Sequence, residues 1–252
     1  MCSKIKTALF VVLCTAIAVS IYSAPRIRAA SVCDFEHGFQ ELSQAKDNTL
    51  ANDSPENIKI ELTLRKIILN QILDCAIHDA MSMQSNIKSL LINDPEIQEI
   101  QNRFLSKFDD TINYYRFQKT LVGDLGITGS KKFSINLKEL RNSNYEPLVE
   151  LGTNFIIFSK NQELLRIAGN RFDQIKRTLQ ALTLTDNETI RALLQNAEDN
   201  FRKANNDNSR AKEIFRSLSW PNDSLSIITS SLGHLKETYQ NFFDIRNEAQ
   251  TR

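Results

Sequence analysis

Apolar residues recur along most of the chain at alternating steps of three and four, the spacing of one face of an α-helix. In the last predicted helix this stripe comprises Leu225, Ile228, Leu232, Leu235, Tyr239 and Phe242. The expected helices span residues 33–46, 55–92, 95–122, 135–143, 147–184, 186–218 and 222–249. The predicted fold is therefore all-α, an elongated bundle of about six to seven helices with coiled-coil-like packing and no sheet.

Prolines indicate where helices begin. Pro55, Pro95, Pro147 and Pro221 each stand at an expected helix start. Proline fits the first turn of a helix, where its missing N–H would have no partner in any case. We therefore interpret all four as helix starts rather than interruptions.

Glycines suggest one division of the chain. Three of the seven glycines fall between residues 123 and 133, which we interpret as a loop. This loop separates an N-terminal helical hairpin region, 31–122, from a C-terminal helical region, 134–252. We expect these two regions to pack as one domain.

The first thirty residues have the order of a secretory signal. Lys4 and Lys6 precede an uncharged run whose apolar centre extends from Ala8 to Tyr22. About fifteen apolar residues are fewer than the roughly twenty of a membrane-spanning helix. Residues 1–30 are therefore predicted to be a signal peptide, with an uncleaved signal-anchor as the alternative. Both predict an extracellular, periplasmic or cell-surface location, and only an uncleaved segment would contact the membrane.

The charge composition argues against polyanionic partners. Lys plus Arg number 31 against 30 Asp plus Glu, which gives a net charge of +1. Such a balance produces no overall field that would attract nucleic acid or an anionic membrane, so binding a polyanion would need a local patch, and none is obvious. No nucleic-acid partner is expected.

Two cysteines remain once the N-terminal segment is set aside. Cys33 and Cys75 would lie in a compartment that permits disulfides, and we predict a bond between them. His37 and His78, each about one helical turn from a cysteine, allow an alternative zinc site of two thiolates and two imidazoles. Oxidising conditions favour the disulfide, so no metal and no cofactor is predicted.

Catalytic motifs are not evident. The three histidines form neither an HExxH motif nor paired Glu-x-x-His motifs, and the serines lack the flanking glycines of a nucleophile elbow. The run from Gly123 to Lys132 fails the spacing of a phosphate-binding loop. The sequence favours a non-enzymatic protein.

Four aromatic residues are candidate contacts for a partner, namely Phe117, Trp220, Tyr239 and Phe243. Phe117 and Phe243 widen the apolar stripes on which their neighbours lie. A wide stripe predicts contacts on two sides, either with a further internal helix or with a partner. Core packing is therefore the alternative role for these side chains.

Three segments resemble uncharacterised exported helical proteins of small-genome, candidate-phylum bacteria. These segments are Ala29–Glu36, Ile72–Cys75 and Tyr239–Asp244. The resemblance includes no functional motif and brings no known activity. It implies a bacterial cell-surface or extracellular setting.

We expect an exported, non-enzymatic helical module that binds another protein, self-associates or builds a surface structure. The first alternative is carriage of an apolar small molecule between helices, in a cavity lined by Phe155, Phe158 and Phe172. The last alternative is a zinc-dependent protein.

Overall fold

Helices account for nearly all of the residues described by the structure, a computed structural model that covers Cys33, residues 35–218 and residues 223–251. No strand occurs among these residues, which confirms the prediction of an all-α fold. The helices are α2 (Glu36–Ala51), α3 (Pro55–Lys88), α4 (Pro95–Leu121), α5 (Ile127–Leu140), α6 (Glu146–Ala181), α7 (Glu188–Ser217) and α8 (Ser224–Gln250). All of them belong to one compact unit, Phe35–Arg252.

Side-chain caps begin three of the helices. The Ser54 hydroxyl accepts a hydrogen bond from the backbone N–H of Asn57 at 3.2 Å, and the Asp94 carboxylate accepts one from Glu96 at 2.8 Å. Pro55 and Pro95 follow these caps directly, so both are confirmed as helix starts. Asn187 caps α7 in the same way. Each cap satisfies a backbone donor that has no partner within the helix.

Pro147 lies in the first turn of α6, as predicted, but the chain before it is also helical. A π-helical turn, Arg141–Tyr145, joins α5 to α6, so the chain is continuously helical over residues 127–181. The backbone N–H of Glu146 donates to the carbonyl of Arg141, five residues earlier. The wider turn allows Pro147, which lacks an N–H, to lie inside a long helical segment.

The loop predicted at residues 123–133 is too long. Only the 3₁₀ turn Val122–Asp124 and the next two residues separate α4 from α5. No described glycine has a positive φ angle, so the backbone here does not need glycine's conformational freedom. Gly129 lies within α5, which shows that glycine composition alone misplaced the helix start.

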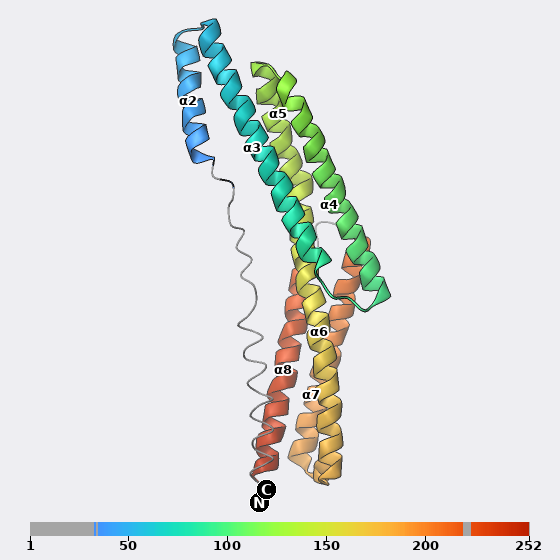
Figure 1. Ribbon diagram of the computed structural model, residues 1–252. Coiled ribbons are helices and arrows are strands. Elements are labelled where there is room, and N and C mark those ends of the chain that lie inside the picture. Colours follow the sequence, from blue (N-terminus) through green and yellow to red (C-terminus); the bar gives the residue numbers. More distant parts are fainter. Residues whose placement is uncertain (1–32, 34, 219–222, 252) are drawn as a thin grey trace, which may run out of the picture. The chain divides into compact units, whose positions relative to one another are not determined.

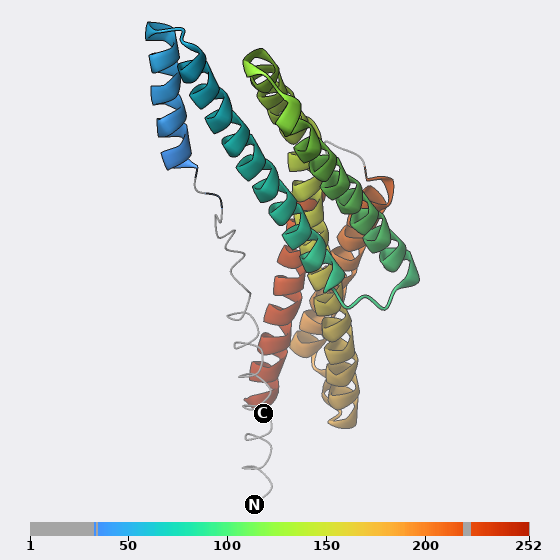
Figure 2. The same cartoon turned by 45° about the horizontal axis from the view of Figure 1, so that its top comes forward.

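The helices form two packed groups that share the continuous helix. In the first group α3 packs against α4 and α5, and α2 covers a further side of α3. In the second group α6, α7 and α8 lie side by side, and the two views in Figures 1 and 2 agree on this arrangement. The α5–α6 helix therefore connects both cores (Figure 1).

The buried face of α8 differs from the predicted stripe. Leu225 is 47% exposed, whereas Ser224, Ser231 and Thr238 are fully buried. The buried positions still alternate by four and three residues, but three of the seven carry small polar side chains. They are Ser224, Ile228, Ser231, Leu235, Thr238, Phe242 and Ile245. The period was predicted correctly. Ile228, Leu235 and Phe242 are buried as predicted, whereas each of the other three predicted positions lies one residue after the buried one.

Aromatic rings fill the region where the two groups meet. Phe155 of α6 lies with its ring centroid 4.9 Å from that of Phe104 in α4 and 5.6 Å from that of Phe215 in α7. Phe158 lies 5.2 Å from Phe215, and all four side chains are fully buried. We call these four residues the aromatic junction. It belongs to the largest hydrophobic cluster of the described residues.

Gly152, on α6 just before the aromatic junction, offers a test of this packing. A Cβ atom there would lie 3.2 Å from Ile87 Cδ1 and 3.4 Å from Phe108 Cε2. We expect Gly152→Leu to lower the free energy of unfolding by about 2–3 kcal/mol, because a buried position would be overpacked. Urea unfolding followed by circular dichroism measures the change.

The control is Gly233→Ala in the exposed part of α8, where a Cβ atom meets nothing within 4 Å. This substitution should raise stability by about 0.5–1 kcal/mol through helix propensity. Equal effects of the two substitutions would contradict the close approach at Gly152.

Candidate functional site

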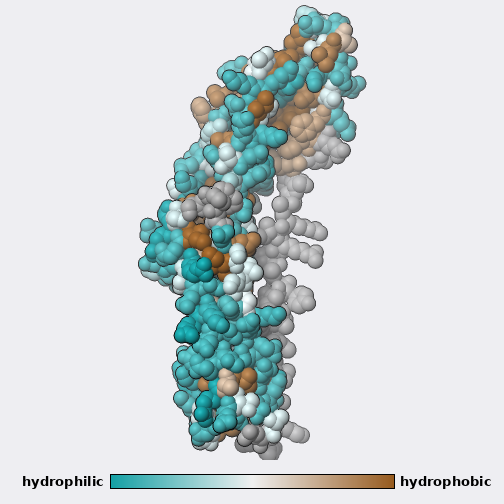
Figure 3. All heavy atoms as spheres, turned by 180° about the vertical axis from the view of Figure 1, so that it is seen from behind, coloured by the Kyte–Doolittle hydropathy of each residue, from teal (hydrophilic) through white to brown (hydrophobic). Residues whose placement is uncertain are grey.

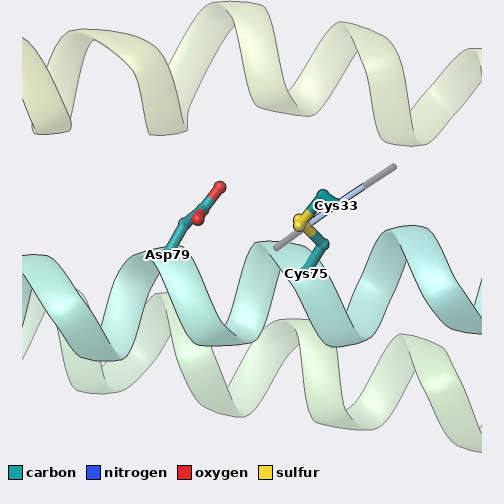
Figure 4. Close-up of side chains that lie close together, drawn as sticks. All are labelled: Cys33, Cys75 and Asp79. Atoms are coloured by element: carbon teal, nitrogen blue, oxygen red, sulfur yellow. The ribbon is translucent and has the colours of Figure 1, made fainter. Parts of the chain in front are cut away.

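Cys33 and Cys75 are disulfide-bonded, as predicted. Figure 4 shows the pair with Asp79, and the ligand atoms of the three residues lie within 4.8 Å of one another. A disulfide offers no thiolate to zinc. The His37 side chain is 86% exposed and lies 3.3 Å from Glu41, outside this group. The geometry therefore does not support the alternative zinc site with His37 and His78.

A buried polar layer crosses the second group of helices. The Asn161 amide of α6 donates to Asn208 Oδ1 of α7 at 3.0 Å and to Ser231 Oγ of α8 at 2.8 Å. Ser231 in turn donates to the Ala204 carbonyl at 2.8 Å. We call Asn161, Asn208 and Ser231 the polar layer.

The polar layer has a neighbour one heptad away. Asn154, seven residues before Asn161, donates to Ser224, seven residues before Ser231, at 3.2 Å. Asn161 Oδ1 is buried without a hydrogen-bond partner among the described residues. Buried hydrogen bonds between helices fix register at some cost in stability. We therefore assign these residues to helix alignment.

The closest approach to a catalytic arrangement is a cluster on α7 and α8. Ser230 Oγ donates to the Asp207 carboxylate at 2.7 Å, and His234 Nε2 lies 3.7 Å from the same carboxylate oxygen. In a Ser-His-Asp triad the serine bonds to the histidine, which removes its proton. Here the serine bonds to the aspartate, so the cluster cannot activate a nucleophile in that way.

Two buried tyrosines lie next to the π turn. The rings of Tyr115 and Tyr145 meet edge to face with centroids 5.9 Å apart. Burial raises the pKa of Tyr115 to about 12, and burial also raises the pKa of Tyr145. Both side chains therefore stay neutral at physiological pH, and they act as core residues.

Ion pairs connect the start of α4 with the end of α7. Lys212 pairs with Glu96 and, at 3.3 Å, with Asp94, while Arg216 pairs with Glu96 at 3.1 Å. Arg103 of α4 also donates to the Arg216 backbone carbonyl. We call Asp94, Glu96, Lys212 and Arg216 the α4–α7 clasp. Because α4 belongs to the first packed group and α7 to the second, the clasp links the two groups.

Charge in the clasp shifts the pKa values of its members. The hydrogen bond and charge of Lys212 lower the pKa of Glu96. Burial opposes ionisation of Asp94, but the backbone N–H of Glu96 and the Lys212 ammonium together lower the pKa of Asp94. The hydrogen bond to Glu96 raises the pKa of Lys212.

The predicted aromatic contact residues have different environments. Phe117 is 60% exposed and Phe243 is 43% exposed, with the Arg246 guanidinium 5.6 Å from the Phe243 ring centre. Tyr239 packs against two of the hydrophobic clusters. Trp220 lies outside the described residues. Phe117 and Phe243 thus remain available for a partner, and Tyr239 is largely used inside the bundle.

A carrier cavity has no support in the described part of the chain. Phe155 and Phe158 pack in the aromatic junction, and Phe172 lies 6.0 Å from Phe242, ring centre to ring centre. The best-formed surface pockets lie elsewhere, along α7 and α8 and at the α3–α4 connection, and polar side chains line most of each. Neither pocket includes Phe155, Phe158 or Phe172.

The chain matches no protein-family model, no curated protein and no solved structure. The resemblance to exported bacterial helical proteins stays a prediction. None of the described helices has an apolar stretch long enough to cross a membrane.

The α4–α7 clasp predicts an acid-sensitive component of stability. The pKa values of Asp94 and Glu96 lie below their ordinary values of 3.8 and 4.5, so their contribution is complete above about pH 5. It is lost as the pH falls through the lowered values, because protonation removes the attraction to Lys212. We expect Lys212→Met to lower the urea midpoint at pH 7 and to flatten its decline between about pH 5 and 3.

The matched control for this titration is Lys160→Met at an exposed position of α6. This variant should keep the wild-type pH dependence. An unchanged decline in the Lys212 variant would show that other carboxylates cause the acid sensitivity.

Proposed function

We propose that the protein is an exported, non-enzymatic helical module that binds another protein or a second copy of itself. The observation that carries this proposal is the uneven distribution of exposed apolar side chains. Ten of the fourteen large apolar side chains exposed among the described residues lie between Phe39 and Ile135, on α2–α5 and their connections. Large exposed apolar areas are typical of interaction sites.

The hydropathy surface supports the same view. In Figure 3 apolar side chains gather near the end of the bundle that carries α2 and α3, whereas the part formed by α6, α7 and α8 is mostly hydrophilic. The described polar clusters fasten helices together, which supports a non-enzymatic role. The surface of α2–α5 is therefore the region we assign to protein contacts.

An apolar stripe on α3 is the strongest candidate for such a contact. Ile60 and Ile67 are 54% and 47% exposed, and Leu64 lies half-buried between them. Spacings of four and seven residues place all three on one face of the helix. The other faces of α3 already pack against α2, α4 and α5. A partner that covered this stripe would complete the burial of α3.

Combined substitution of Ile60→Ser and Ile67→Ser tests the proposed contact. We expect the mass of the wild-type protein to rise with concentration in analytical ultracentrifugation. The double variant should need at least a tenfold higher concentration for the same rise in mass. Loss of two large apolar contacts accounts for a change of this order.

Leu91→Ser provides the control, because Leu91 is 99% exposed on the short α3–α4 connection. It should associate like wild type. A monomer at every concentration, combined with no cross-linked species, would rule out self-association and leave only a different protein as the partner.

Export is proposed from two features, the apolar N-terminal segment and the disulfide. Disulfides persist in oxidising compartments, and the charged residues Lys4 and Lys6 precede the apolar run as in a secretory signal. The location we propose is extracellular, periplasmic or on the cell surface.

A reporter fusion tests export directly. Residues 1–40 placed before an alkaline phosphatase that is active only outside the cytoplasm should give activity in a bacterial host. Leu13→Arg should abolish it, since a charge interrupts the apolar centre. Ser3→Arg, which adds charge only before that centre, should leave activity unchanged. Equal activity of all three fusions would contradict a signal function.

A further inference from the structure

The C-terminal part of α4 and most of α5 together carry an excess of positive charge. Residues 111–138 contain five cationic side chains and one anionic side chain. The cations are Arg116, Lys119, Lys131, Lys132 and Lys138, and the anion is Asp124. Because the whole chain has a net charge of only +1, this region is set apart from the rest. We call residues 111–138 the basic tip.

The same segment presents apolar side chains to solvent. Tyr114, Phe117 and Leu121 are 37%, 60% and 38% exposed. Their spacings of three and four residues place them along one side of α4, in its last turns before the connection. Their neighbour Tyr115 instead points into the core, where it contacts Tyr145. Some aromatic residues of the basic tip therefore lie in the core and others lie on the surface.

Two exposed lysines follow this stripe along the chain, beyond the short connection. Lys131 and Lys132 are exposed near the start of α5, and only five residues separate α4 from α5. Lys66 of α3 donates to the Gly123 carbonyl at 2.6 Å, which adds another ammonium group at the connection. Lys119 is paired with Asp74 at 2.5 Å, and Lys131 interacts electrostatically with the buried carboxylate of Glu61. The remaining charge available to a partner comes chiefly from the other lysines of α5 and from Arg116.

We propose that the basic tip is a docking site for an anionic lipid membrane. Lysines attract the headgroups of anionic lipids, while exposed phenylalanine and leucine enter the boundary with the acyl chains and tyrosine favours the interface. Nucleic acid would use the cations but would gain little from Leu121. This inference concerns a different surface from the α3 stripe and does not depend on protein binding there.

Vesicle co-sedimentation of the full chain tests the proposal. The probes are vesicles of phosphatidylcholine alone and vesicles in which one third of the lipid is phosphatidylglycerol. Wild type should bind the anionic vesicles at least tenfold more tightly, and high salt should weaken this binding. The combined Lys131→Glu and Lys132→Glu variant should lose roughly tenfold or more, since each charge near the surface contributes separately. Phe117→Ser should lose a smaller, salt-independent part.

Matched controls keep the test independent of the N-terminal segment, which every variant retains. Lys160→Glu with Lys236→Glu reverses two exposed charges on α6 and α8, and Leu182→Ser removes an apolar side chain that is 50% exposed. These controls should bind like wild type. Equal binding to both kinds of vesicle, or equal losses in the controls, would overturn the proposal. If polyglutamate displaces the vesicles and Phe117→Ser binds the vesicles like wild type, the basic tip is a site for an acidic protein instead.

Discussion

Phe155 and Phe158 lie one turn apart on α6, and their rings contact aromatic rings from α4 and α7. This aromatic junction is the constraint on which the two packed groups depend, because α6 is the helix they share. Buried aromatic pairs contribute both large apolar area and a preferred geometry. The junction therefore fixes the position along the bundle at which the end of α7 lies beside the start of α4. The ion pairs of the α4–α7 clasp are possible only because those two helix ends meet there.

Beyond the junction, the alignment of the helices in the second group depends on buried hydrogen bonds. Apolar layers alone tolerate a shift of one helix along another, since hydrophobic burial has no direction. A shift of α8 would separate Ser231 from Asn161 and leave buried amide groups without partners, which is costly. Asn154 and Ser224 repeat the same restriction one heptad earlier. The polar residues thus specify the alignment that the leucine and phenylalanine layers stabilise.

These structural roles account for most of the buried polar chemistry of the described residues. Asp207, Ser230 and His234 link α7 to α8 in an arrangement that does not suit nucleophilic catalysis. The two surfaces that we propose for binding are the apolar stripe of α3 and the basic tip. Both lie on α2–α5, and in this proposal the α6–α8 group supports them.

Local physics determined much of this protein from sequence alone. Helical periodicity and capped prolines depend on neighbouring residues, so the helices and the starts at Pro55 and Pro95 were predictable. The disulfide was also predictable, because only two cysteines remain outside the apolar N-terminal segment. For Phe117 the sequence left two alternatives, a partner contact at the surface or packing in the core.

Tertiary packing decided what the sequence left undetermined. The continuity of α5 with α6 was not predicted, because residue preferences do not reveal the π turn that joins the two helices. The polar layer was missed because serine and asparagine look like surface residues until Asn161 and Ser231 are seen to bond across the core. The buried face of α8 depends on where α6 and α7 pack against it, and the sequence of α8 contains no information about its neighbours' positions.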